Sequence, residues 1–147
     1  MIFERIFHFS EEIINHLQKY TDAYPKLYFS DSRAIPNAFI VYNIYNNNNY
    51  IGFIILSNDG VASYKINDFE LIIGIFKKYQ NRGYLKTVVS EFITRHPSLT
   101  PPFILGAIIN HKNKRKPNIF NTLLKLGFQN SALDLDAKYD LEYQVNL

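Results

Sequence analysis

The 147-residue sequence predicts a single α/β domain, of the α+β kind, built around a mixed and mostly antiparallel sheet. Two patterns predict this class. In the first half, runs of β-branched and aromatic residues are separated by turn-forming residues, which is typical of antiparallel strands. In the second half, extended segments alternate with segments of helical periodicity, which indicates a parallel crossover. No linker rich in Gly, Ser or Pro divides the chain, so residues 1–147 are expected to form one domain.

The composition favours a folded protein that needs neither metal nor disulfide bonds. Apolar residues make up 47% of the chain and charged residues only 20%, so a hydrophobic core can form. The chain has no cysteine, which excludes a disulfide, a cysteine nucleophile and a thiolate metal site. Its four histidines show no metal-ligand spacing, so no metal is expected. The net charge of +3 is compatible with an anionic ligand but is too small to indicate a duplex-binding protein.

The N-terminal segment and the apolar runs predict a cytoplasmic protein with no membrane partner. Residues 1–5 lack the basic and apolar segments of a secretory signal. The longest apolar run, residues 51–56, is far shorter than the ~18 residues that indicate a membrane span. The absence of cysteine also permits a reducing cytoplasm.

In the first half, the sequence predicts a helix followed by an antiparallel meander. Ser10 and the two glutamates after it resemble a helix start, because a hydroxyl cap and first-turn carboxylates suit the positive end of the helix dipole. Strands are expected over residues 38–45 and 50–57, joined in a hairpin by the four asparagines of residues 46–49. A further turn leads to a third strand that ends over residues 69–76.

In the second half, the pattern changes to helices that alternate with strands. The expected segments are a helix that begins at Tyr84 and that Pro97 ends, a strand over 103–109, a helix that ends at Gly127, and strands over 128–133 and 139–145. The first of these helices would connect two strands as a crossover. The strand that ends at Phe76 is therefore expected to run parallel to the one that begins at Phe103.

Residues 77–85, between the third strand and the helix that follows it, form a candidate anion-binding loop. The loop opens directly into a helix N-terminus, where backbone N–H groups and the helix dipole favour a pyrophosphate. Gly83 would allow an anion to approach the backbone closely. Positive charge surrounds it on Lys77, Lys78, Arg82 and Lys86.

This loop resembles the pyrophosphate loop of the Gcn5-related N-acetyltransferase (GNAT) superfamily, which reads Arg/Gln-x-x-Gly-x-Gly/Ala. The segment Gln80-Asn81-Arg82-Gly83-Tyr84-Leu85 matches that motif at Gln80 and Gly83 and departs from it at Leu85. A second segment, residues 118–128, resembles the late helix of the family, which ends in Lys-x-Gly-Phe. The resemblance covers roughly residues 51–147.

The resemblance implies a sheet of six to seven strands with a splayed parallel pair, and about four helices. It also implies acetyl-CoA as the co-substrate, with its pantetheine arm between the splayed strands. By position, the main chain of Ile73 and Ile75 would bind this arm, and Gly74 would either let it pass or mark a bulge. The diphosphate would lie on Gln80, Asn81, Arg82, Gly83, Tyr84, Leu85 and Lys86, with Asn118 as a further cofactor-binding candidate.

The chemistry that the resemblance implies is direct transfer. A neutral amine attacks the thioester carbonyl, a base accepts the proton, and an acid can protonate the departing thiolate. Glu70 is the expected base, because some family members carry one on this strand; the alternative is that it faces solvent. The tyrosine that many members use as the acid is replaced here by Leu123. Tyr84, Tyr139 or Tyr143 could take that role, or the protein has no dedicated acid, or it has lost catalysis.

The basic stretch at residues 111–116 has three interpretations that the sequence leaves open. It can be a solvated loop, it can contact the phosphates of CoA, or it can bind a polyanion. The first interpretation is favoured, because solvated basic loops are common on protein surfaces.

Three functions are compatible with these residues. The first is an N-acetyltransferase whose partner is an amine-bearing acceptor, either a small molecule or a protein. The second is a GNAT-fold module that binds CoA without catalysis, which Leu85 and Leu123 favour. The third is an acetyltransferase toxin that acts on charged tRNA through the basic stretch, although the low net charge disfavours a nucleic acid as partner. The sequence also allows a homodimer.

Overall fold

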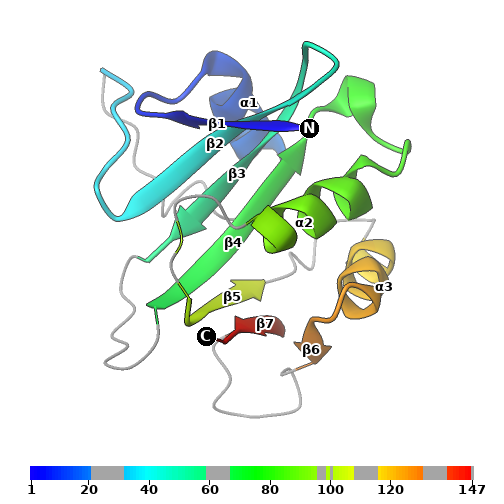
Figure 1. The fold of residues 1–147 in the computed structure, drawn as a ribbon. Helices are drawn as coiled ribbons and strands as arrows, with labels where there is room; N and C mark the ends of the chain where they lie inside the picture. Colours follow the sequence, from blue (N-terminus) through cyan, green and yellow to red (C-terminus); the bar gives the residue numbers. More distant parts are fainter. Residues whose placement is uncertain are drawn as a thin grey trace.

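The chain folds into a seven-stranded sheet with helices on both faces (Figure 1). The computed structural model describes residues 1–20, 32–58, 67–95, 99, 101–107, 116–130 and 139–146. The strand order is β1-β2-β3-β4-β5-β7-β6. The elements are β1 (Ile2–Ile6), α1 (Glu11–Tyr20), β2 (Phe39–Asn46), β3 (Asn49–Ser57), β4 (Asn67–Ile75), the 3-10 helix η2 (Lys77–Tyr79), α2 (Tyr84–Arg95), β5 (Phe103–Ala107), α3 (Lys116–Lys125), β6 (Gln129–Asn130) and β7 (Leu141–Val145). The predicted α+β class is confirmed.

All neighbouring strands of the described sheet are antiparallel except β4 and β5. The parallel register runs from Asn67↔Phe103 to Glu70↔Gly106 and ends there among the described residues, whereas β4 continues to Ile75. Figure 1 shows β5 turning away from β4 as the two strands proceed. We call residues 71–75 of β4, beyond the parallel ladder, the open edge of β4. The predicted crossover by α2 and the splayed parallel pair are thus confirmed.

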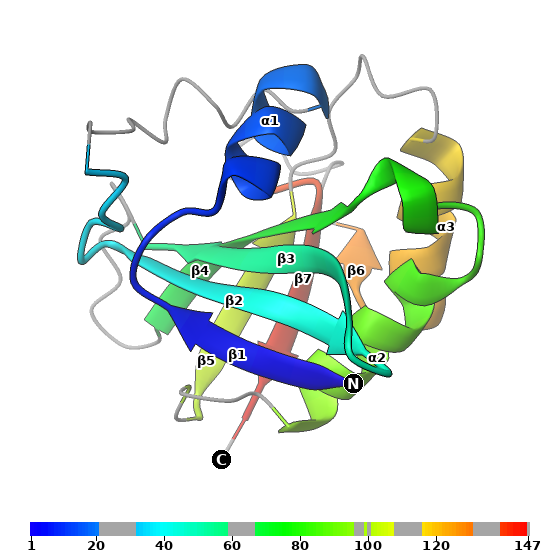
Figure 2. The same cartoon turned by 90° about the horizontal axis from the view of Figure 1, so that it is seen from above.

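The two faces of the sheet carry separate hydrophobic clusters. In Figure 2, α1 covers one face, whereas α2 and α3 lie on the other. The first cluster includes Ile13 and Leu17 of α1 and Phe53 of β3. The second includes Phe92 of α2 and Leu123 of α3. The side chains of β4 alternate between the two clusters. The α2 face carries Phe69, Leu71, Ile73 and Ile75. The α1 face carries Ile72 and, just after the strand, Phe76.

The start of α1 and the end of α3 lie where the sequence predicted them. The backbone N–H of Ile13 donates to Oγ of Ser10 at 3.2 Å, so Ser10 caps the start of α1. After α3, Gly127 adopts φ 102°, and its N–H donates to the Leu124 carbonyl at 3.1 Å. Both predictions are confirmed.

The described residues contain three α-helices and η2, where the sequence predicted about four helices.

The edge strand β1 was not predicted. Its burial pattern lacks the alternation of a half-buried strand, since only Phe3 and Ile6 are partly buried. Phe3 packs edge-on against Phe92 at 5.7 Å, and the Arg95 guanidinium lies 4.6 Å from the Phe3 ring centre. The strand is therefore held by residues that lie about ninety positions away in the sequence.

Some predicted features lie outside the described residues. These are Pro97, the far ends of the strands expected over 103–109 and 128–133, and the basic stretch at 111–116 apart from the backbone of Lys116. Within the described part of the chain, no helix combines the length and the apolar character needed to cross a bilayer.

Candidate functional site

The turn between β4 and α2 is held in a defined shape by its own hydrogen bonds. After β4, the N–H of Phe76 donates to the Ile51 carbonyl at 2.9 Å, which ties the start of the turn to β3. The side-chain Nε2 of Gln80 donates to the carbonyl of Ile75 at 2.9 Å and so closes the turn. Because this bond spans the turn, it fixes the direction in which the chain enters α2.

Two residues of the turn adopt left-handed backbone conformations, Asn81 with φ 64° and Gly83 with φ 78°. Asparagine and glycine are the residues that reach this region at lowest cost. A Cβ atom at Gly83 would meet no atom within 4 Å. The backbone there is therefore open on the side where any other residue would carry a side chain.

A pocket of about 160 Å³ lies beside this turn. Its lining comes from the end of β4, the turn, the start of α2 and α3, namely Ile75, Tyr79, Gln80, Asn81, Gly83, Tyr84, Leu85, Asn118, Ile119 and Thr122. Seven of the ten residues that the sequence predicted for the cofactor line this pocket: Ile75, Gln80, Asn81, Gly83, Tyr84, Leu85 and Asn118. Residues far apart in the sequence, such as Gln80 and Asn118, thus line the same pocket.

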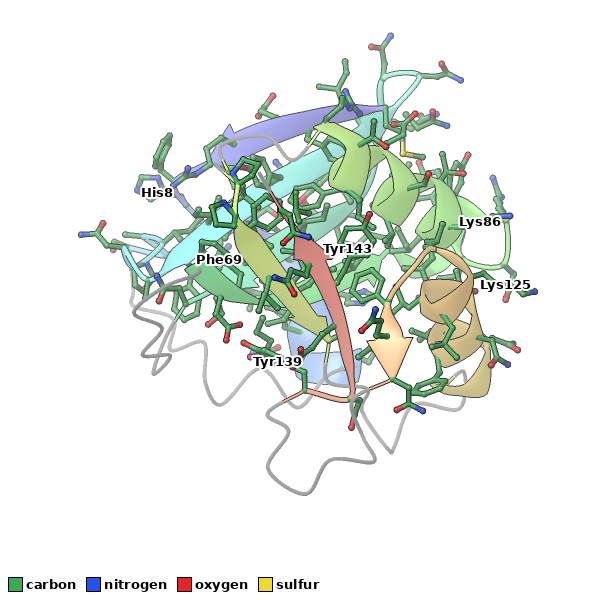
Figure 3. All side chains as sticks on the ribbon, turned by 60° about the horizontal axis from the view of Figure 1, so that its bottom comes forward. His8, Phe69, Lys86, Lys125, Tyr139 and Tyr143 are labelled. Atoms are coloured by element: carbon green, nitrogen blue, oxygen red, sulfur yellow. The ribbon has the colours of Figure 1, made fainter. Side chains whose placement is uncertain are left out.

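The other three predicted cofactor residues lie outside the pocket lining. Ile73 packs against the hydrophobic cluster on the α2 face. The exposed Arg82 guanidinium lies 5.9 Å from the centre of the Tyr79 ring, and Lys86 is exposed on α2. Figure 3 shows Lys86 and Lys125 of α3 on the same side of the molecule. Arg82 and Lys86 do not line the pocket, but each is a direct chain neighbour of a residue that does.

Three lining residues belong to the segments that the sequence singled out but were not predicted to bind the cofactor: Tyr79, Ile119 and Thr122. Ile119 and Thr122 lie on the same helix as Asn118, and their i, i+1 and i+4 spacing is the signal that could have found them. Tyr79 lies beside Tyr84, with 6.4 Å between ring centres, and its position one residue before Gln80 was the available signal.

The electrostatics of the pocket suit an anion. No acidic residue lies in the first turn of α2 or of α3. The first-turn N–H groups of a helix have no intrahelical acceptor, and the helix dipole adds positive potential at that end. Around the turn, the Lys78 ammonium lies 5.6 Å from the Tyr79 ring centre. The turn can therefore bind a phosphate-bearing group without a dedicated side-chain ligand.

The position at which the acid was expected is Leu123, which is buried in the core with 4% of its surface exposed. The three tyrosines that could replace this acid, Tyr84, Tyr139 and Tyr143, lie elsewhere. The Tyr84 hydroxyl accepts a hydrogen bond from Nδ2 of Asn46 at 3.3 Å and lies at the pocket. Tyr143 packs on Phe128, with ring centres 5.3 Å apart.

Tyr139 is engaged elsewhere. Its hydroxyl donates to Oδ1 of Asp68 at 2.8 Å, and its ring covers Gly106 so closely that a Cβ there would overlap it. Burial, followed by the bond to Asp68, raises the pKa of Tyr139 well above its usual value. This hydroxyl is a poor proton donor and instead ties β4 to the segment that leads into β7.

Glu70, the predicted base, is half-buried on β4 and, among the described residues, forms the last parallel register pair, with Gly106. The alternation of β4 places it on the α1 face, together with Ile72 and Gly74. It therefore lies on the side of the sheet opposite to α2. Among the described residues, no group of three His, Asp or Glu side chains could hold a metal ion.

His16 of α1 lies over β4 on the same face. Its ring centre is 5.4 Å from that of Phe53 and 6.0 Å from that of Phe76, both in edge-on contact. Burial lowers the pKa of His16 to about 4, so the imidazole is neutral at pH 7.

Acidification is expected to weaken the fold through His16. Its pKa is about 4 in the folded protein against an ordinary value of 6.5, so the unfolded chain binds the proton first as the pH falls. Stability present above pH 6.5 is lost towards pH 4, by on the order of 1–2 kcal/mol after allowance for partial exposure. Urea unfolding at pH 7 and pH 4.5 measures this loss, which should be smaller in His16→Gln. An equal loss in both proteins would contradict the prediction.

Comparisons by sequence find no relatives: no protein-family model matches the chain, and no curated protein matches it. Comparisons by structure find many. The E. coli protein YhhK, solved bound to coenzyme A, aligns over 99% of this chain and 100% of that one, with 15% identity and a TM-score of 0.56. The spermidine/spermine N-acetyltransferase SpeG from Vibrio cholerae aligns over 97% of this chain and 88% of that one, with 10% identity and a TM-score of 0.60.

A mutant form of the V. cholerae enzyme also matches, with 14% identity and a TM-score of 0.56. That alignment covers 74% of this chain and 65%, less than two thirds, of the other. The two alignments that span nearly the full length of both chains show a shared overall fold. The chain has the fold of the GNAT N-acetyltransferases.

Proposed function

We propose that this protein transfers the acetyl group of acetyl-CoA to a primary amine by direct attack. The observation that carries the proposal is the pocket at the turn between β4 and α2, where the backbone at Gly83 is open and where the open edge of β4 ends. The GNAT fold and the coenzyme A bound by the matching E. coli protein support it.

The residues present fit the groups of acetyl-CoA. The open backbone at Gly83 and the start of α2 would hold the diphosphate, with Asn118 of α3 on the facing wall. Arg82 and Lys86 would add long-range attraction. The main chain of Ile73 and Ile75, on the open edge of β4, would bind the pantetheine arm in the manner of an added strand.

The reaction requires a neutral amine, because an ammonium group has no lone pair with which to attack. The C–N bond forms as the C–S bond breaks, one proton leaves the amine, and the thiolate of coenzyme A departs. Glu70, on the α1 face of β4, is a candidate proton acceptor. The acceptor would be an amine on a small molecule or on a protein.

A second candidate function is binding of CoA without catalysis. The buried Leu123 favours it, because the position where many GNAT enzymes carry an acidic tyrosine is here part of the core. In that case the pocket would serve a sensor or an interaction module. The two candidates share the cofactor site and differ only in turnover.

One experiment separates the two candidates. Acetyl-CoA at about 100 times its Kd is expected to raise the Tm of the protein by about 5–10 °C. Release of free thiol is then followed with spermidine, tyramine and a peptide with a free N-terminus as acceptors. Stabilisation with thiol release supports the transferase, and stabilisation without release supports the binding module. A Tm that acetyl-CoA leaves unchanged would contradict both.

A further inference from the structure

The hairpin of β2 and β3 ends in a tight turn with a bulge beside it. The two residues that connect the strands, Asn47 and Asn48, have φ 50° and 66°, which is typical of a two-residue type I′ turn. Just inside this turn, the described register between the strands skips Ile51. A bulge of this kind bends a strand and re-aims its side chains. We call residues 45–51 the hairpin end.

The bulge changes the faces on which the side chains of the hairpin end lie. Ile51 packs in the cluster on the α2 face, although strict alternation along β3 would place it on the α1 face. Tyr50 lies on the α1 face instead, where its ring meets that of Phe76 edge-on, with 4.9 Å between ring centres. On β2, alternation from the buried Ile44 places Asn46 on the α2 face.

As a result, the hairpin end contacts both ends of the turn between β4 and α2. Where that turn begins, the N–H of Phe76 donates to the carbonyl of the bulged Ile51 at 2.9 Å. Where it ends, Nδ2 of Asn46 donates to the hydroxyl of Tyr84, the first residue of α2, at 3.3 Å. One hairpin therefore fixes where the turn starts and where the helix after it begins.

The turn between these two contacts presents unused backbone donors. In the part of the chain that the structure describes, the N–H groups of residues 81–86 have no hydrogen-bond acceptor. The directions of these groups depend on the backbone conformation, which is left-handed at Asn81 and Gly83. A preformed arrangement binds a ligand more tightly than one that the ligand must order. A contact that fixes the turn can therefore raise affinity without touching the ligand.

We propose that Asn46 is a positioning residue of the cofactor site, which holds Tyr84 so that the N–H groups of residues 81–86 are directed toward the diphosphate of acetyl-CoA. This role rests on the proposed cofactor site, which both candidate functions share. Asn46 is not one of the residues that line the pocket. An amide suits the role because it donates to the hydroxyl and carries no charge, whereas a carboxylate would repel a diphosphate.

The test is titration calorimetry with acetyl-CoA on five proteins: wild type, Asn46→Ala, Tyr84→Phe, the double variant and Asn49→Ala. Asn49 is the matched control, because it is the register partner of Asn46 in the same hairpin and is exposed. Asn46→Ala is expected to raise the Kd about 5-fold, the usual effect of losing one hydrogen bond. Asn49→Ala should bind acetyl-CoA as the wild type does.

The double variant tests whether Asn46 acts through the Tyr84 hydroxyl. Tyr84→Phe keeps the ring and removes the hydroxyl, so it should raise the Kd by about the same factor as Asn46→Ala. The double variant should lose no more than either single variant. In turnover, the KM for acetyl-CoA should rise in Asn46→Ala while kcat stays unchanged, because the loss is one of binding. A hairpin that only stabilised the fold would leave both constants unchanged.

Two results would overturn the role of Asn46. One is a Kd within about 1.5-fold of wild type in folded Asn46→Ala, or in Tyr84→Phe if Asn46→Ala does not fold. The other is a loss in the double variant that equals the product of the two single losses, because independent effects multiply. With a wild type that binds acetyl-CoA, either result leaves the cofactor site in place. A wild type that does not bind acetyl-CoA contradicts the proposed function as well.

Discussion

Replacement of Gly83 by valine is expected to lower the affinity for acetyl-CoA by about 100-fold or more, the cost of losing two to three good hydrogen bonds to a charged group. Gly83 lines the pocket with φ 78°, and a Cβ there would enter open space rather than the protein interior. A branched side chain would occupy the space that the diphosphate needs and would push the turn out of its left-handed conformation. Titration calorimetry with acetyl-CoA measures the change.

A control must separate backbone strain from obstruction of the pocket. Asn48, in the turn between β2 and β3, has φ 66°, is exposed, and is not one of the residues that line the pocket. Asn48→Val and Gly83→Val should lose similar stability, about 1–2 kcal/mol each for a branched residue in this region. Only Gly83→Val should lose affinity. Equal affinities for both variants would show that the turn at Gly83 does not bind the cofactor.

Gly106→Ala is expected to lower the free energy of unfolding by about 2–4 kcal/mol, which is large for the addition of one methyl group. A Cβ at Gly106 would overlap the ring of Tyr139, a residue with 3% of its surface exposed. The ring can move only by breaking the 2.8 Å bond from its hydroxyl to Asp68. Urea unfolding of the variant measures the loss.

A double-mutant cycle identifies the cause. In a Tyr139→Ala background the ring is gone, so Gly106→Ala should cost less than about 0.5 kcal/mol. Tyr139→Phe is the matched control, because it keeps the ring and removes only the hydroxyl, and Gly106→Ala should remain costly there. If Gly106→Ala cost the same in the wild-type and Tyr139→Ala backgrounds, contact with the ring would not be its cause.

The parts of the fold that the sequence predicted depend on contacts between near neighbours. The hairpin of β2 and β3, the cap at Ser10 and the stop at Gly127 each involve residues within a few positions of one another. The turn before α2 belongs to the same class, because a motif of six residues defines it. Periodicity and turn chemistry record such contacts directly.

The rest depends on contacts that leave no local pattern. Strand β1 has little alternation because it lies at the sheet edge and is held by Phe92 and Arg95. The bond between Tyr139 and Asp68 joins residues 71 positions apart. His16 is an isolated histidine in an amphipathic helix, and only the tertiary structure shows that it lies over a glycine of β4. A single sequence contains no signal for such pairs.

The short parallel ladder between β4 and β5 has a mechanical consequence. The sheet consists of two parts, β1–β4 and β5–β7. Across their common boundary, the part of the chain that the structure describes shows four parallel register pairs and the Tyr139–Asp68 bond. A ligand bound along residues 71–75 of β4 would add contacts at this boundary and hold the two parts together. Cofactor binding and the cooperativity of unfolding would then be coupled, and amide exchange in both parts would slow when the splay is filled.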